Sequence, residues 1–241
     1  MQYIPIKTRV VEPPQDDLFS VLAESLKDVQ EGDVLLITSK IVSIHQGRCV
    51  PVGSVEKRLL VEQEADYLIE GHQKFMMSPL AIKHHALFYA AGIDESNANG
   101  HYVLLPEKPF DMAEAIWKFV REAHGLTNVG VIITDSHSQP LRVGAVGVSL
   151  GWWGFHPTES HKGKLDLFGR PLHFSVTNIV DCLAAGAGAV CGETNESTPL
   201  VIARGVPHLR FTKVDTRHEL FKSQTDDIYY PLLKPFYERK D

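Results

Sequence analysis

Acidic, hydroxyl and basic side chains follow directly on an apolar run near the middle of this chain. Residues Val129 to Ile133 form a short apolar stretch typical of a buried β-strand, and the chain then continues through Thr134, Asp135, Ser136 and His137 to Arg142. Open α/β sheets tend to hold ligands beyond the carboxyl ends of their strands. Asp135 and Ser136 are therefore predicted to lie at the rim of a sheet, where an acid and a hydroxyl can bind a ligand.

Two further turns carry acids in similar settings. Asp94 and Asn97 lie in the turn after the apolar residues near Ala90, and Glu193 lies between a predicted helix and the strand Leu200–Ala203. Three carboxylates on three turns could share one metal site, since hard ions such as Mg²⁺ and Mn²⁺ prefer oxygen ligands. The alternative is that Asp94 and Glu193 act only as caps or in Asx turns.

Several other polar residues allow two interpretations. Arg142 and Arg170 can hold a phosphate or a carboxylate through two parallel hydrogen bonds, or they can form ordinary surface ion pairs. His137 can donate to a phosphate or lie solvated in a loop. The pair His84–His85 has no matching partner at ligand spacing, so we interpret it as structural or exposed.

The composition favours a globular protein of the reducing cytoplasm. The chain has 241 residues, of which 44% are hydrophobic, and this suffices for a substantial core. A net charge of −6 argues against binding to nucleic acid or to anionic membranes, because both interactions depend on clustered Lys and Arg. The cysteines are three in number and lack C-x-x-C spacing, which disfavours a disulfide framework or a structural zinc site. Neither an apolar leader nor a stretch of about 20 apolar residues occurs, so a soluble protein is expected.

Apolar periodicity predicts strands and helices that follow one another without a linker. The predicted strands are Tyr3–Val11, Val34–Thr38, Tyr102–Leu105, Val129–Ile133, His173–Thr177 and Leu200–Ala203. The predicted helices begin near Asp16 or Asp17, or lie within Val55–Phe75, Met112–His124 and Ile179–Val190. Residues 1–241 are therefore predicted to form a single domain, with two closely packed lobes at most.

The connections between these elements carry further expectations. Ser39 to Gly47 is interpreted as a polar connection, and Gly125 as the end of the helix before it. The glycines of Val143–Phe155 are interpreted chiefly as sites of close packing, with Trp152 and Trp153 in a core or a subunit interface. No phosphate-binding loop of the form G-x-x-x-x-G-K-[ST] occurs, and no G-x-G-x-x-G lies between a strand and a helix. A nucleotide would therefore need a different cradle.

Five segments together resemble the coenzyme F420:L-glutamate ligase family, whose members are also called F420-0:γ-glutamyl ligases. The matching segments are Asp33–Lys40, Ala91–Asn97, Val129–Asp135, Asp166–Arg170 and Gly192-Glu193 followed by Pro199. They occur in the family's order and span most of the chain, so the match is specific although each motif alone is weak.

The resemblance implies a homodimeric α+β enzyme with mixed sheets and packed helices. Such an enzyme uses GTP, a divalent ion (Mg²⁺ or Mn²⁺) and a monovalent cation such as K⁺. It joins L-glutamate through an amide bond to a carboxylate acceptor, either coenzyme F420-0 or a folate-like molecule. Activation of that acceptor as an acyl phosphate explains the need for cations, since two negative charges 4 Å apart repel by about 4 kcal/mol at an effective dielectric constant of 20.

The resemblance also assigns roles to individual residues. Asp94 and Asp135 would hold one divalent ion, and Ser136 and Glu193 would serve a second. Asn97 would contact the nucleotide. Beyond the resemblance, we predict that Ser39, Lys40, Gly192 and Thr194 also contact nucleotide or cofactor, and that Asp135 and Arg142 are catalytic.

The chain departs from the family pattern at two positions. Ile4 to Val10 replaces a Gly-Leu-Pro-like loop that contacts guanine, and Ile44 stands where the family often carries a phosphate-binding lysine. Lys40 is the expected substitute for that lysine, and the alternative is that it only extends into solvent. Two other functions therefore stay open: a folate-type γ-glutamyl ligase, and a degenerate member that binds nucleotide or cofactor without turnover.

Overall fold

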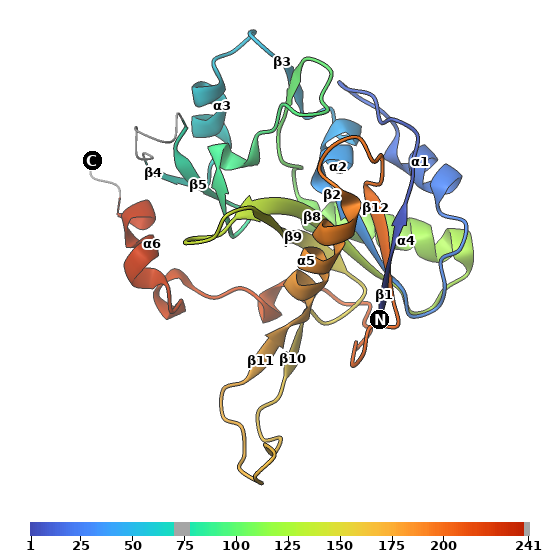
Figure 1. Cartoon of the computed structure of the whole chain (residues 1–241), viewed down its shortest axis with the longest axis vertical. Helices are drawn as coiled ribbons and strands as arrows, with labels where there is room; N and C mark the ends of the chain where they lie inside the picture. The colour runs from blue at the N-terminus through green and yellow to red at the C-terminus, as the bar shows by residue number, and fades with distance from the viewer. Residues whose placement is uncertain (70–77, 239–241) are drawn as a thin grey trace.

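A five-stranded mixed sheet forms the centre of the molecule (Figure 1). The computed structural model describes residues 1–69 and 78–238. The strand order across the sheet is β1 (Gln2–Ile6), β12 (Leu200–Arg204), β2 (Val34–Thr38), β8 (Gly130–Ser138) and β9 (Ala145–Trp153). β2 and β8 run parallel, and the other neighbouring pairs run antiparallel. Because Thr38 is in register with Thr134, Ser39 and Asp135, the next residue of each segment, lie close together.

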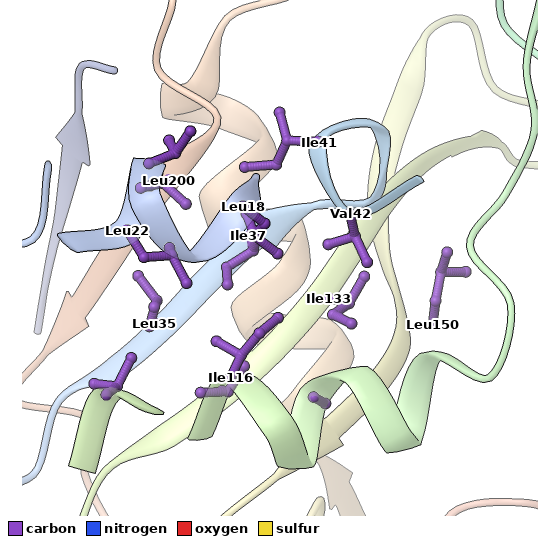
Figure 2. Packing of buried hydrophobic residues seen from close by; sticks show 14 of the residues in the cluster. Leu18, Leu22, Leu35, Ile37, Ile41, Val42, Ile116, Ile133, Leu150 and Leu200 are labelled. Atoms are coloured by element: carbon purple, nitrogen blue, oxygen red, sulfur yellow. The ribbon is translucent and has the colours of Figure 1, made fainter. Parts of the chain in front are cut away.

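Helices cover both faces of this sheet. α1 (Leu18–Ser25), α2 (Ser39–His45) and α4 (Pro109–His124) pack on one face, and α5 (Ile179–Cys191) crosses the other (Figure 1). Within β2, Leu35 and Ile37 face the first group of helices, whereas Val34 and Leu36 face α5. Figure 2 shows how the larger of these two clusters joins Leu18, Ile37 and Ile116 from three different elements. Burial on both faces explains why β2 is apolar throughout.

The two longest helices follow their sequence signals closely. α4 begins with a proline in its first turn and buries Ala113, Ile116 and Val120 at helical spacing. It ends at Gly125, whose φ of 64° lies in the left-handed region that suits glycine. α5 begins at Asn178, whose side chain accepts a hydrogen bond from the backbone N–H of Asp181. The predictions for both helices are confirmed within one to three residues.

The chain between α2 and α4 builds a second lobe beside the main sheet. It contains β3 (Cys49–Pro51) paired with β7 (His101–Val103), and a sheet of β4 (Tyr67–Ile69), β5 (Leu80–Lys83) and β6 (Ala86–Tyr89). α3 (Lys57–Glu64) and the short 3₁₀-helix η1 (Ala90–Gly92) complete it. A small apolar cluster forms its centre, while Phe88 and Leu105 reach into the core of the main body. The α+β fold with mixed sheets is as predicted.

An arm and a C-terminal segment complete the chain. β10 (Thr158–Ser160) and β11 (Val176–Asn178) pair in a two-stranded arm that projects away from the body (Figure 1). The last segment carries the 3₁₀-helices η2 (Arg217–Glu219) and η3 (Gln224–Asp226) and the helix α6 (Tyr230–Tyr237). α6 packs on the second lobe, where the rings of Tyr67 and Tyr237 meet edge to face. None of the described helices is both long and apolar enough to cross a membrane.

Some sequence predictions gave the wrong kind of secondary structure. Ser39 to His45 is a helix rather than a polar connection, because Ile41, Val42 and Ile44 pack into the main core. Val55–Phe75 holds a helix only at Lys57–Glu64, followed by the strand β4, and residues 70–75 lie outside the described part of the chain.

Other predictions were wrong in their bounds. The first strand ends at Ile6 rather than Val11, and the strand expected at His173–Thr177 is β11, at Val176–Asn178. β8 does not end at Ile133 but continues to Ser138 as one half of a hairpin with β9. The register shifts between Ile133 and Thr134, so an irregularity in the ladder marks the point where an end was expected.

Candidate active site

A pocket of about 430 Å³ lies where the main sheet, the second lobe and the loop after α5 meet. Its walls come from the end of β2, the middle of β8, the first turn of α2, the turn after η1 and residues 192–199. Almost every site residue predicted from sequence lines it: Ser39, Lys40, Asp94, Asn97, Asp135, Ser136, Gly192, Glu193 and Thr194. Segments separated by up to about 150 positions in the chain therefore converge on one cavity.

Asp135 forms the wall that belongs to the main sheet. Its carboxylate accepts a hydrogen bond from the hydroxyl of Ser39 and one from the backbone N–H of Ser136, the latter at 2.6 Å. Burial raises the pKa of Asp135 to about 6, although these two hydrogen bonds act in the opposite direction. The nearby negative charge of Asp94 adds to the upward shift. The carboxylates of Asp94 and Asp135, one from the second lobe and one from the main sheet, therefore lie close enough to interact electrostatically.

Asp94 forms the facing wall, and Lys40 holds it. The Nζ atom of Lys40 lies 2.7 Å from Oδ2 of Asp94. Ser96 donates to the same carboxylate from its backbone N–H at 2.8 Å and from its hydroxyl at 2.9 Å. Partial burial works against ionisation, but the hydrogen bonds from Lys40 and Ser96 prevail and lower the pKa of Asp94. Asp94 is thus an ionised carboxylate at neutral pH.

The loop after α5 closes the third side of the pocket. Gly192 has a φ of 75°, which favours glycine, and a Cβ atom there would lie 2.2 Å from Cδ of Glu196, so any side chain would displace Glu196. Glu196 accepts from the backbone N–H of Thr194 at 2.8 Å and from its hydroxyl at 3.0 Å. Asn97 then donates from Nδ2 to the carbonyl oxygen of Thr194 at 2.7 Å. One hydrogen bond therefore joins the Asp94 turn to the Glu193 loop.

Glycines allow the elements behind the pocket to approach closely. A Cβ atom at Gly147 would lie 2.2 Å from the carbonyl oxygen of Ala184 in α5, and one at Gly151 would lie 2.7 Å from the backbone of Pro109. Gly147 itself lines the pocket beside α5. The interpretation of the Gly-rich passage as a site of close packing is confirmed, and both Trp152 and Trp153 are buried.

Other predicted residues lie elsewhere. Arg142 is exposed in the turn between β8 and β9 and is not among the described residues that line the pocket. Arg170 is exposed in the arm. His84 and His85 form the turn between β5 and β6, where burial is the main cause of the lowered pKa of His84. His137 is half-buried against Phe88 and is not solvated as a loop residue would be. A catalytic role for Arg142 stays a prediction.

Two pocket residues were missed from sequence. Ser96 and Glu196 fix the turns that carry Asp94 and Thr194. Both lie within two residues of a predicted ligand, so short polar spacing within the same turn was the available signal.

The donor set suits a hard divalent ion, although not in the single three-carboxylate site expected from sequence. Among the described residues, no three His, Cys, Asp or Glu side chains converge in a way that could hold a metal ion. Asp94, Asp135 and Glu193 nevertheless line the same pocket, with the hydroxyls of Ser39 and Ser136 beside them. Within the described chain, the carboxylate of Glu193 forms no hydrogen bond or ion pair. Carboxylate and hydroxyl oxygens of this kind are the ligands that Mg²⁺ and Mn²⁺ prefer.

The fold and the pocket define an α+β protein with an acidic, ligand-sized cavity at the edge of a mixed sheet. The family model for F420-0:Gamma-glutamyl ligase matches residues 5–205. Coenzyme F420:L-glutamate ligase of Methanopyrus kandleri is 33% identical over 94% of this chain and 95% of its own length. The enzymes of that name from Methanothermobacter thermautotrophicus (33% identical, 80% of this chain and 83% of its own) and Haloarcula marismortui (32%, 95% of both) are also similar.

The chain therefore belongs to the F420-0:γ-glutamyl ligase family, as the resemblance of its motifs predicted. The five segments that carried the resemblance all lie within the matched residues.

Proposed function

We propose that this chain is a nucleotide- and divalent-metal-dependent γ-glutamyl ligase, which activates an acceptor carboxylate as an acyl phosphate and joins it to L-glutamate. The relatives named as coenzyme F420:L-glutamate ligases supply the reaction class. The observation that carries the proposal is the meeting of Asp94, Asp135 and Glu193 with Lys40 in a single pocket. That combination suits a ligand with several negative charges.

Charge is the main obstacle to this reaction. The acceptor carboxylate attacks the γ-phosphorus of GTP and releases GDP, and the amine of L-glutamate then attacks the acyl carbon and releases phosphate. A divalent ion polarises phosphoryl oxygens and neutralises their charge. Asp94 and Asp135 would hold one such ion, with Ser136 and Glu193 serving a second. A monovalent cation such as K⁺ would offset further phosphate charge.

The chain's own residues orient these groups. Ser39 directs one oxygen of Asp135 through its hydroxyl, and Asn97 ties the Asp94 turn to the Glu193 loop. Gly192 and Thr194 shape the loop beside which the nucleotide would lie. Ile44 is 1% exposed and belongs to the main core, so position 44 offers no cation. Lys40 and Arg9 both line the pocket, and they are the cations that would contact phosphate.

The arm supports a homodimer of this ligase. Leu167, Phe168 and Phe174 are 98%, 87% and 93% exposed on the projecting arm. Large apolar side chains displayed together in this way mark interaction surfaces. A second copy of the chain is the proposed partner. Light scattering should give a dimer for the wild type and a monomer for a Phe168→Asp, Phe174→Asp variant, and a monomeric wild type would contradict the proposal.

A phosphate-release assay tests the activity. Purified protein is incubated with L-glutamate, Mg²⁺ or Mn²⁺ and either GTP or ATP, together with coenzyme F420-0 or a folate as acceptor. We expect release that requires both glutamate and the F420-0 acceptor, with GTP preferred over ATP. Release only with the folate would identify a folate-type ligase, and tight nucleotide binding without release under any condition would identify a degenerate binding protein.

A further inference from the structure

All three contacts of the Lys40 ammonium group are with the turn that carries Asp94. Its Nζ atom lies 2.7 Å from Oδ2 of Asp94, 2.7 Å from the carbonyl oxygen of Ser96 and 3.2 Å from the hydroxyl of Ser96. An ammonium group has three protons, so these contacts leave none free. In this arrangement Lys40 cannot also bind a phosphate.

The same contact occupies the Asp94 oxygen that faces Lys40. Oδ1 of Asp94 accepts from the backbone N–H of Ser96 at 2.8 Å, and Oδ2 accepts from the hydroxyl of Ser96 at 2.9 Å as well as from Lys40. A divalent ion bound by this carboxylate would share its ligand with an ammonium group. Two cations on one oxygen repel each other, so the metal and Lys40 compete for Asp94.

Lys40 also offsets part of the negative charge of the pocket. Asp94 raises the pKa of Asp135, whereas Lys40 lowers it, so the three groups interact across the cavity. A quarter of the Lys40 side chain is exposed, and its long stem leaves the first turn of α2 at the pocket wall. The ammonium group therefore has room to turn towards a ligand in the cavity.

We propose that Lys40 is an exchangeable counter-ion: it holds Asp94 while the pocket contains no divalent ion, and it is released to the nucleotide phosphates when the ion takes its place. This inference rests on the proposed function and adds a link between the two ligands. Binding of the ion frees the cation that the nucleotide needs, so each ligand strengthens the binding of the other. Lys40 is thus a positioning residue for the metal site as well as a phosphate contact.

Mn²⁺ binding, measured by electron paramagnetic resonance without nucleotide, tests the exchange. Lys40→Met removes the competitor, so its affinity for Mn²⁺ should rise about tenfold over the wild type, which corresponds to about 1.4 kcal/mol. With Mn²⁺ present, its affinity for a non-hydrolysable GTP analogue should fall by at least about tenfold. The strengthening of analogue binding by Mn²⁺ should also be smaller in the variant than in the wild type.

Lys57→Met provides a matched control. Lys57 pairs with the neighbouring Glu95 at 2.7 Å and is 28% exposed, and it is not among the described residues that line the pocket. Its loss removes one positive charge that contacts the same turn, through Glu95 rather than Asp94, and it should leave both affinities unchanged. Thermal melts would verify that all variants fold.

Two results would overturn the exchange. One is an Mn²⁺ affinity of Lys40→Met that is equal to or weaker than that of the wild type, and the other is a wild type that binds no Mn²⁺. Failure of the proposed function has a different signature, namely normal Mn²⁺ and nucleotide binding without glutamate-dependent phosphate release. The two failures are therefore distinguishable in the same set of proteins.

Discussion

The main sheet and the second lobe each supply one carboxylate to the pocket, but they are held together by different forces. The main body buries apolar side chains on both faces of its sheet, in two large clusters. The second lobe has a smaller apolar cluster and depends more on polar contacts, among them the pairs of Arg48 with Glu64 and with Glu107. Asp135 therefore lies on a strand that is held by apolar packing, whereas Asp94 lies on a turn that is held by an ion pair and hydrogen bonds.

Replacing a buried leucine should destabilise the main body more than the second lobe, and this is the largest effect that we expect. Leu35 is fully buried in the main body, and Leu60 is 6% exposed in the cluster of the second lobe. Leucine-to-alanine changes in cores cost about 2 to 5 kcal/mol, with the cost set by how far the site can relax. We expect Leu35→Ala to lie near the upper end and Leu60→Ala near the lower end. Urea unfolding measures both free energies of unfolding. An equal loss in the two variants would contradict the claim that the main body depends more on apolar packing than the second lobe does.

Arg48 should be the most important polar contact of the second lobe. Its guanidinium group lies 2.5 Å from Glu64 and 2.9 Å from Glu107, and its Nε atom donates to the carbonyl oxygen of Leu105 at 3.1 Å. Arg48→Met keeps much of the apolar stem but leaves Glu64, which is only 16% exposed, without its closest partner. The free energy of unfolding should fall by about 1 to 3 kcal/mol. Lys118→Met, at a surface pair with Glu114 in α4, is the control and should change it by less than about 1 kcal/mol.

His84 should give the second lobe a smaller, pH-dependent contribution. Its Nε2 atom lies 2.9 Å from the carbonyl oxygen of Pro106, and burial, more than the charge of Lys83, lowers its pKa. In the unfolded chain His84 binds a proton near pH 6.5, whereas in the folded chain it binds one only at lower pH. The free energy of unfolding is therefore highest above about pH 6.5 and decreases as the pH falls below it. Unfolding free energies measured between pH 8 and pH 5.5 should decline more steeply for the wild type than for His84→Gln. Parallel curves would show that His84 has no such effect.

The sequence predicted the pocket better than it predicted the contacts inside it. Apolar runs and glycine turns are local signals, and they placed Asp94 and Glu193 in loops that do line one pocket. Asp135 lines the same pocket, but it lies within β8 and not beyond the end of a strand. The helix at Ser39–His45 was missed because its seven residues are too few to show a clear helical period. The pairs of Lys40 with Asp94 and of Ser39 with Asp135 join residues that are far apart in the chain. Nothing in either local sequence specifies such a partner, so only the fold could reveal it.

The central claim is that one carboxylate from each region acts on the same bound ligands. A double-mutant cycle of Asp94→Asn and Asp135→Asn tests it most directly, with glutamate-dependent phosphate release as the measured rate and circular dichroism melts as the check on folding. Residues that act as a unit are strongly non-additive. We predict that either single variant loses activity by about a hundredfold or more, a loss comparable to that of a key electrostatic contact in other enzymes, and that the double variant is no worse. Independent losses that multiply in the double variant, or near-normal activity in either single variant, would contradict the account.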